Sequence, residues 1–207
     1  MALIEIVDPD PSWPAQFTVV HDTLAEVLGD DALRIDHIGS TAVPGLAAKD
    51  VIDVQVTVAA LDDTLVDRLT AAGFTGRPDI TSDVLVGGDD PEQLAKRYVQ
   101  ERPGDRRANI HLRAGGRRNQ RYALLFRDHL RADDVVRDAY GQLKRHLAGL
   151  YPDDAEGYYD IKDPVMDIIY RGAEAWAAAT GWTGSCAACP WFRRCARRSI
   201  LRWWRKP

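Results

Sequence analysis

The sequence predicts an α+β fold in which helices flank a small mixed β-sheet. Segments with the helical spacing of apolar residues come before, between and after short segments that alternate like strands. The strand-like segments enclose one helix and are followed by several helices, an order typical of α+β proteins. No internal repeat or low-complexity tract interrupts this order.

The expected helices show apolar residues on one face, and their ends carry the residues that helix termini favour. Ser12 is a suitable N-cap for the first helix, and Gly29 is a suitable end for it. The helical segments are residues 14–28, 61–72, a region that begins near residue 119, 134–150 and about 161–180.

Strands are expected where apolar residues alternate with polar ones or form short runs. In the strand over residues 109–113, Ile110 and Leu112 point to the core, and Asn109, His111 and Arg113 share the opposite face. Residues 95–100 fit either a strand or a helical turn. The other expected strands are residues 4–7, 34–38 and 51–58, with short extended pieces between 74 and 86.

Length and composition are those of a globular protein. The chain of 207 residues is long enough for one full-sized domain, and its apolar fraction of 45% and charged fraction of 28% are ordinary. No run approaches the ~18 apolar residues that span a bilayer. The N-terminus lacks the basic start and long apolar region of a signal peptide. We therefore expect a cytoplasmic location.

The end of the chain differs in charge from the rest. Residues 183–207 contain seven Lys or Arg and no Asp or Glu, which leaves residues 1–182 with 20 basic and 31 acidic groups, a formal charge of −11. We predict a domain over residues 1–182 and a basic, Cys- and Trp-containing tail over residues 183–207. An acidic body repels nucleic acid, so a nucleic-acid partner is not expected for it.

The tail holds all three cysteines of the chain, Cys186, Cys189 and Cys195. A structural zinc site takes four ligands, so three thiols are a weak metal motif within one chain, although they permit metal-linked dimerisation. The Trp and Arg residues of the tail resemble a segment that contacts a membrane surface or a protein partner. The alternative is a plain basic extension without such a role. The oligomeric state is left open.

The stretch over residues 34–58 carries the strongest functional pattern. Gly39 lets the backbone approach a ligand, and Ser40 and Thr41 follow with hydroxyl and N–H groups that suit a phosphate. Asp53 lies on the next strand and shares a face with Gln55. A phosphate-binding turn followed by a strand carboxylate predicts a site for a metal–nucleotide complex. The alternative is a purely structural turn.

Other polar residues have two interpretations each. The face shared by Asn109, His111 and Arg113 is either part of a site or the solvent side of an edge strand. Lys49 either reaches a phosphate as a point charge or is an ordinary surface lysine. Arg127 is either a phosphate ligand or part of a structural ion pair with its neighbour. Lys162 opens the last helix and is either a phosphate ligand or an ordinary surface residue of its first turn.

The segment HIGSTAVPGLAAK followed by IDV resembles the GrpB family, small bacterial proteins related to the nucleotidyltransferase fold. The segments DPDPSWPAQF, NIHLR, LLFRDHLR and YYDIKDPVMDIIYRGAEAW resemble the same family in the same order. The likeness covers nearly all of residues 3–180 and excludes the tail. It implies a nucleotidyltransferase-like sheet with the nucleotide pocket at the Gly39–Ser40 turn.

The resemblance also implies which residues do the chemistry. In the wider superfamily a strand with two carboxylates follows the turn, and a later strand adds a third. Asp53 matches the first carboxylate, Gln55 stands at the second, and His111 at the later strand. This departure questions two-metal chemistry, while Asp53 and His111 together suit one divalent ion, Mg²⁺ or Mn²⁺.

Two hypotheses follow. In the first, the protein is a nucleotidyltransferase that binds a nucleoside triphosphate with a divalent metal, and transfers a nucleotidyl group to an unknown small molecule or protein. Asp53 and His111 would be the catalytic and metal-binding residues. In the second, it is an inactive nucleotide- or CoA-binding regulatory or folding module, related to the domain fused to dephospho-CoA kinase. The residues assigned to nucleotide binding are Gly39, Ser40, Thr41, Lys49, Asn109, Arg113, Arg127 and Lys162.

Overall fold

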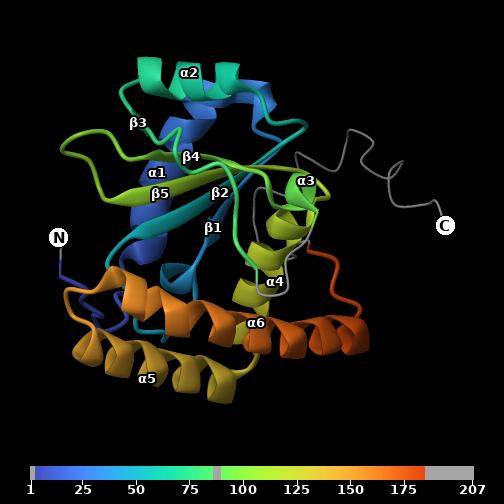
Figure 1. The fold of residues 1–207 in the computed structure, drawn as a ribbon. Helices are drawn as coiled ribbons and strands as arrows, with labels where there is room; N and C mark the ends of the chain where they lie inside the picture. Colours follow the sequence, from blue (N-terminus) through green and yellow to red (C-terminus); the bar gives the residue numbers. More distant parts are fainter. Residues whose placement is uncertain (1–2, 86–89, 185–207) are drawn as a thin grey trace.

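The structure is a computed structural model that describes residues 3–85 and 90–184 (Figure 1). Five strands form one sheet in the order β1-β2-β5-β4-β3. The central pair, β2 and β5, is parallel, and the other pairs are antiparallel. The predicted α+β fold with a small mixed sheet is thereby confirmed. The strands are β1 Arg34–Ile38, β2 Ile52–Val58, β3 Thr75–Gly76, β4 Arg97–Gln100 and β5 Ala108–Ala114.

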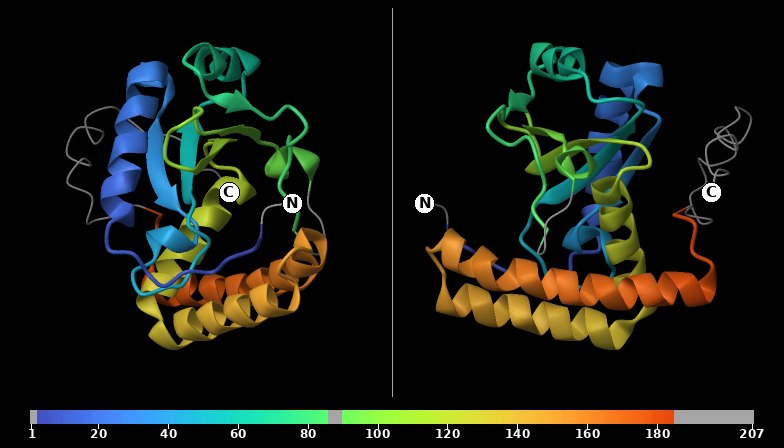
Figure 2. Two further views of the ribbon diagram at one scale, coloured as in Figure 1. Left: turned by 90° about the vertical axis from the view of Figure 1, so that its left-hand side faces the viewer. Right: turned by 45° about the vertical axis from the view of Figure 1, so that its right-hand side comes forward.

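Helices cover both faces of the sheet and one of its ends. The α-helices are α1 Trp13–Leu28, α2 Asp63–Ala71, α3 Pro91–Leu94, α4 Arg118–Ala132, α5 Asp134–Leu150 and α6 Ala155–Thr180. Short 3₁₀ helices η1 Gly29–Asp31 and η2 Ser40–Ala42 flank β1. In Figures 1 and 2, α5 and α6 run side by side across one end of the sheet. None of the described helices combines the length and apolar character needed to cross a membrane.

Strand alternation sorts the central strands into an apolar and a polar face. Val54 and Val56 of β2 and Ile110 and Leu112 of β5 are fully buried, where they pack with residues of α1 and α2. The opposite face carries Asp53 and Gln55 of β2 beside Asn109 and His111 of β5. This face turns toward α4, whose Gln120 is hydrogen-bonded to Gln55 and Thr57. The division of β5 into two faces agrees with the sequence prediction.

A second apolar cluster attaches α4, α5 and α6 to the loop after β1. Val43 and Leu46 of that loop pack with Leu125 and Leu130 of α4, Tyr140 of α5 and Tyr170 of α6. This packing holds α5 and α6 against the loop that follows the Gly39–Ser40 turn. Residues far apart in the chain are therefore brought to one place.

Several local predictions were wrong. Residues 4–7 form only a single bridge, Val7 to Ala48, in place of a strand. Ser12 precedes α1, but its hydroxyl accepts from Gln16 at 2.8 Å and does not cap the helix backbone. The last helix begins at Ala155, earlier than predicted, because the Asp154 side chain caps it by accepting from the Gly157 N–H at 3.0 Å.

The structure also shows the secondary structure of one ambiguous segment and of one short helix. Residues 97–100, which were ambiguous, form β4. The short helix α3 was not predicted. The cysteines and all predictions for residues 185–207 lie outside the described part of the chain.

Candidate functional site

The Gly39–Ser40 turn and Asp53 form one packed unit. Gly39 has φ 68° and ψ −170°, a backbone conformation that favours glycine. A Cβ atom on Gly39 would lie 2.2 Å from Asp53 Oδ2 and 2.9 Å from Asp53 Cβ. The carboxylate therefore lies directly against the turn.

Asn109 holds Asp53 in place. The two residues are neighbours in the parallel β2–β5 pair, and Asn109 Nδ2 donates to Asp53 Oδ1 at 2.8 Å. Tyr98 of β4 donates its hydroxyl proton to Asn109 Oδ1. Burial raises the pKa of Asp53, against the effects of this hydrogen bond and of nearby cations. The cations are Lys162, Arg113 and Lys144.

Lys144 of α5 reaches the same turn from the other side. Its side chain is almost fully buried, and Nζ donates to Ser40 Oγ at 2.7 Å and to the Ala47 carbonyl. Nζ also lies 4.8 Å from the centre of the Tyr140 ring. Burial, followed by the charge of Lys162, lowers the pKa of Lys144 to about 7.

Two further lysines lie near the turn. Lys49 donates to the Tyr159 hydroxyl at 3.0 Å, and its Nζ lies 4.5 Å from the ring centres of both Tyr158 and Tyr159. Lys162 of α6 donates to Asp163 and to Met166 Sδ, and lies 5.2 Å from the Tyr159 ring centre. Its charge acts on both Asp53 and Lys144. We call Lys49, Lys144 and Lys162 the lysine cluster.

The charges of this cluster are only partly compensated. Within residues 3–85 and 90–184, neither Lys49 nor Lys144 forms an ion pair; their partners are hydroxyl, carbonyl and aromatic groups. Lys162 pairs with Asp163, whose carboxylate is largely exposed. An arrangement of three amines around one acid and a Gly-Ser turn is suited to an anionic ligand.

Gln55 occupies the place where a second carboxylate would stand. It is fully buried, its Oε1 accepts from Arg113 at 2.8 Å, and its Nε2 donates to the Gln120 carbonyl at 3.1 Å. Arg113 also pairs with Asp83 at 2.9 Å, and Lys96 pairs with Asp83 at 2.7 Å. This side of the site is therefore a closed network of amide and ion-pair contacts.

His111 lies beside this network. It faces Gln55 across the β2–β5 pair, its Nδ1 is 3.4 Å from an Arg113 nitrogen, and its ring meets Tyr98 edge-on at 5.0 Å. Burial, followed by the charges of Arg113 and Lys96, holds the pKa of His111 well below its usual range. The imidazole is therefore neutral near pH 7.

The donor set fits one metal ion better than two. In the described part of the chain, no three His, Cys, Asp or Glu side chains gather where they could hold a metal ion. Mg²⁺ is commonly held by one or two carboxylates together with substrate phosphates, and Asp53 meets that requirement when a phosphate is bound. The Arg113 cation beside Gln55 disfavours a second ion.

The side chains of two predicted binding residues make structural contacts away from Asp53 and the lysine cluster. The buried Thr41 hydroxyl donates to the Val51 carbonyl at 3.2 Å and lies 3.0 Å from His37 Nε2. Arg127 is also buried, donates to the His37 carbonyl at 2.9 Å and pairs with Asp128 at 2.7 Å. These contacts favour the structural interpretation of Arg127.

Of the other predicted residues, Asp53 contacts Gly39 and Asn109. Arg113 and His111 lie at the Gln55 network, and Lys49 and Lys162 lie beside Tyr159.

Sequence reasoning missed Lys144, although a clue was present. The buried residues of α5 are Tyr140, Gly141, Lys144 and Leu147, so a lysine stands within the apolar face of the helix. A charged residue at such a position requires a partner or a function. Asp83 and Lys96 were also missed, and their contacts with β5 bridge segments distant in the sequence.

Similar proteins share most of this chain. The family model described as GrpB protein matches residues 3–171. A dephospho-CoA kinase from Mycolicibacterium paratuberculosis is 40% identical over 197 residues, which is 87% of this chain and 48% of that protein. A UPF0157 protein from Halalkalibacterium halodurans is 34% identical over 179 residues, 84% of each chain. The chain thus spans about half the length of the kinase relative.

Solved structures resemble the fold. The crystal structure of GrpB from Enterococcus faecalis is 29% identical, with a TM-score of 0.68 over 83% of this chain and 99% of that one. Cid1 in complex with its short product ApU is 16% identical, with a TM-score of 0.46 over 70% of this chain and 43% of that one. The second likeness is too weak to carry an argument about ligands.

Proposed function

We propose that this chain, which belongs to the GrpB family, binds a nucleoside triphosphate between the Gly39–Ser40 turn and the lysine cluster. The observation that carries the proposal is the buried Lys144 amine, 2.7 Å from Ser40 Oγ and without an ion-pair partner in the described residues. Burying a charged amine costs free energy, so a buried lysine without an ion-pair partner is a candidate for ligand binding. A phosphate at this turn would supply the missing negative charge.

Each part of the site has a role in this proposal. Gly39 lets the Asp53 carboxylate lie against the turn, and Ser40 offers a hydroxyl to a phosphate oxygen. Lys144 and Lys162 neutralise phosphate charge as point charges. Asp53 would hold one Mg²⁺ together with the phosphates, and that ion would add further charge neutralisation.

Binding without transfer is the form that the geometry supports best. Two-metal phosphoryl chemistry needs additional anionic ligands beside the first carboxylate. Here the second position is Gln55, which is already bonded to Arg113. The match to about half of proteins named dephospho-CoA kinase is consistent with a nucleotide- or CoA-binding module that acts beside an enzyme.

Nucleotidyl transfer is the second candidate, with His111 as its candidate base. The neutral imidazole can accept a proton from an attacking hydroxyl, although its low pKa makes it a weak base. In that case Asp53 would orient the ligand through the bound metal. The acceptor would be a small molecule or a protein, since the acidic body is unsuited to nucleic acid.

The first experiment measures binding by isothermal titration calorimetry of the full chain with each nucleoside triphosphate and Mg²⁺ or Mn²⁺. Lys144→Met should weaken binding about tenfold or more, since a charge-assisted contact is lost. Arg68→Ala on α2 is the control, because Arg68 pairs with Asp31 away from the site. Absence of saturable binding, or equal affinities for the two variants, would overturn the proposal.

The second experiment separates binding from transfer. Labelled triphosphate is incubated with the protein and cell extract, and transferred label is measured for the unmodified chain, Asp53→Asn and His111→Gln. Loss of transferred label in both variants supports nucleotidyl transfer by this protein. Saturable binding with no transferred label supports the binding module and rejects the enzyme.

A further inference from the structure

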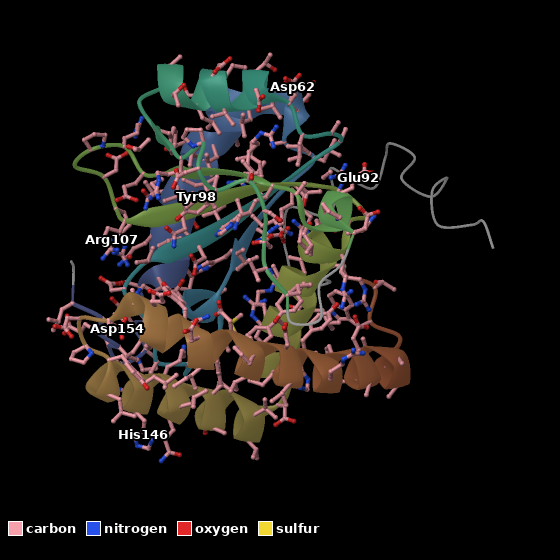
Figure 3. The ribbon with its side chains drawn as sticks, viewed as in Figure 1. Asp62, Glu92, Tyr98, Arg107, His146 and Asp154 are labelled. Atoms are coloured by element: carbon pink, nitrogen blue, oxygen red, sulfur yellow. The ribbon has the colours of Figure 1, made fainter. Side chains whose placement is uncertain are left out.

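A cationic cavity lies away from the lysine cluster. It has a volume of about 360 Å³ and is formed by α3, the start of α4 and the second half of α6. Its lining includes Gly116 and the arginines 117, 118, 121 and 171. Figure 3 shows Glu92 of α3, which bonds to Arg117, well separated from Tyr98 at the candidate nucleotide site. We call this cavity the arginine pocket.

The arginine pocket carries an excess of positive charge. Its lining contains four arginines and a single carboxylate, Glu174. Arg121 bonds to Glu174 and, at 3.1 Å, to the Tyr170 hydroxyl, while Arg117 pairs with Glu92 at 2.8 Å. No ion pair of Arg171 is found among the described residues, and its side chain is exposed. Arg171 therefore adds a cation to the lining that no ion pair in the described residues balances.

Helix α4, whose first turn borders the pocket, adds to the excess of positive charge. Asp residues cap α2, α3, α5 and α6 through their side chains, whereas α4 has no side-chain cap and no acidic residue in its first turn. Arg118 and Arg121 instead occupy that turn, where the helix dipole disfavours cations. Arg171 approaches the cavity from a different helix, so the cations do not depend on α4 alone.

We propose that the arginine pocket binds a small molecule through a phosphate or diphosphate group. Guanidinium groups form paired hydrogen bonds with phosphate oxygens, and several of them around one cavity favour an anion with more than one charge. The volume is that of a small-molecule site. Residues 1–182 carry a formal charge of −11, which disfavours a long nucleic acid as the occupant.

The test uses the isotope-labelled full chain and pyrophosphate as the probe, followed by nuclear magnetic resonance. The Gly116 amide reports on the arginine pocket, and the Gly39 amide reports on the lysine cluster. We expect the Gly116 signal to shift and saturate. Arg171→Ala should weaken this binding about tenfold, because one charge-assisted contact is lost, whereas Arg68→Ala on α2 should leave it unchanged.

Further arms of the titration locate and identify the ligand class. In Lys144→Met the shift of the Gly116 amide signal should persist even where the shift of the Gly39 signal is lost. Failure of the proposal for one site can therefore be told apart from failure of the proposal for the other. The proposal is overturned if Gly116 does not saturate, or if Arg171→Ala and Arg68→Ala behave alike. It is also overturned if a single-stranded oligonucleotide saturates the shift of the Gly116 amide signal at a lower concentration than pyrophosphate does.

Discussion

Gly39 and Asp53 approach so closely that a Cβ atom on Gly39 would lie 2.2 Å from the Asp53 carboxylate. The contact joins the turn after β1 to the start of β2, two segments that pair as antiparallel strands. Both the positive φ of Gly39 and the space beside it require glycine. The turn and the acid therefore depend on each other for their positions.

Gly39→Ala should destabilise the fold by more than about 3 kcal/mol, because backbone strain and a steric clash add together. Gly29→Ala is a matched control. Gly29 has φ 54°, but a Cβ there would meet no atom within 4 Å, so strain alone should cost about 1–2 kcal/mol. Urea unfolding of both variants measures the difference. Equal losses would show that Asp53 does not restrict Gly39.

Lys144→Met should make the protein more stable by about 1 kcal/mol at pH 7, even though it weakens ligand binding. Burial and the charge of Lys162 lower the Lys144 pKa from its ordinary value of 10.5 to about 7. Between these two values the unfolded chain binds more protons, so the stability of the unmodified protein should rise with pH. The variant should lose this rise. Thermal unfolding across this pH range is the measurement.

Ligand binding should depend on pH through the same amine. A bound phosphate favours the charged form of Lys144, so binding above its pKa of about 7 requires proton uptake. From about pH 7.5 to about pH 9, affinity should fall by up to about tenfold per pH unit. Calorimetry in buffers with different ionisation enthalpies measures the proton uptake. An unchanged uptake in Lys144→Met would assign the proton to another group.

Local sequence patterns predicted much of this fold because they report on local physics. Alternation in β5 placed Ile110 and Leu112 in the core, where the structure has them. Helix α5 was predicted with its observed ends, Asp134 and Leu150, since its apolar spacing is regular. The start of α6 was missed because the Asp154 cap was not recognised.

Most residues predicted for the site adjoin the Gly39–Ser40 turn or share a strand with one another, and Lys49, Arg127 and Lys162 are the exceptions. Asn109 could be placed beside His111 by alternation, but its pairing with Asp53 depends on the parallel register of two distant strands. Lys144 reaches Ser40 across 104 residues of sequence. Such contacts are decided by how helices pack, which no local pattern encodes.

Asp83→Asn should destabilise the protein by roughly 2–3 kcal/mol, since Arg113 and Lys96 would lose their shared carboxylate. Burial acts to raise the pKa of Asp83, but these two cations outweigh it and hold that pKa well below its usual range. The stability from this ion-pair network is therefore present above about pH 4 and is lost as the pH falls toward the folded pKa.

Acid titration of unfolding, followed by circular dichroism, tests this dependence in the unmodified protein and in Asp83→Asn. Asp31→Asn is the control, because its pair with Arg68 is exposed and screened by solvent. If the two variants lose stability equally, the Asp83 network is no more important than a surface ion pair. A larger loss in Asp83→Asn, complete above about pH 4 and shrinking as the pH falls below that value, would show that Asp83 compensates the cations beside Gln55.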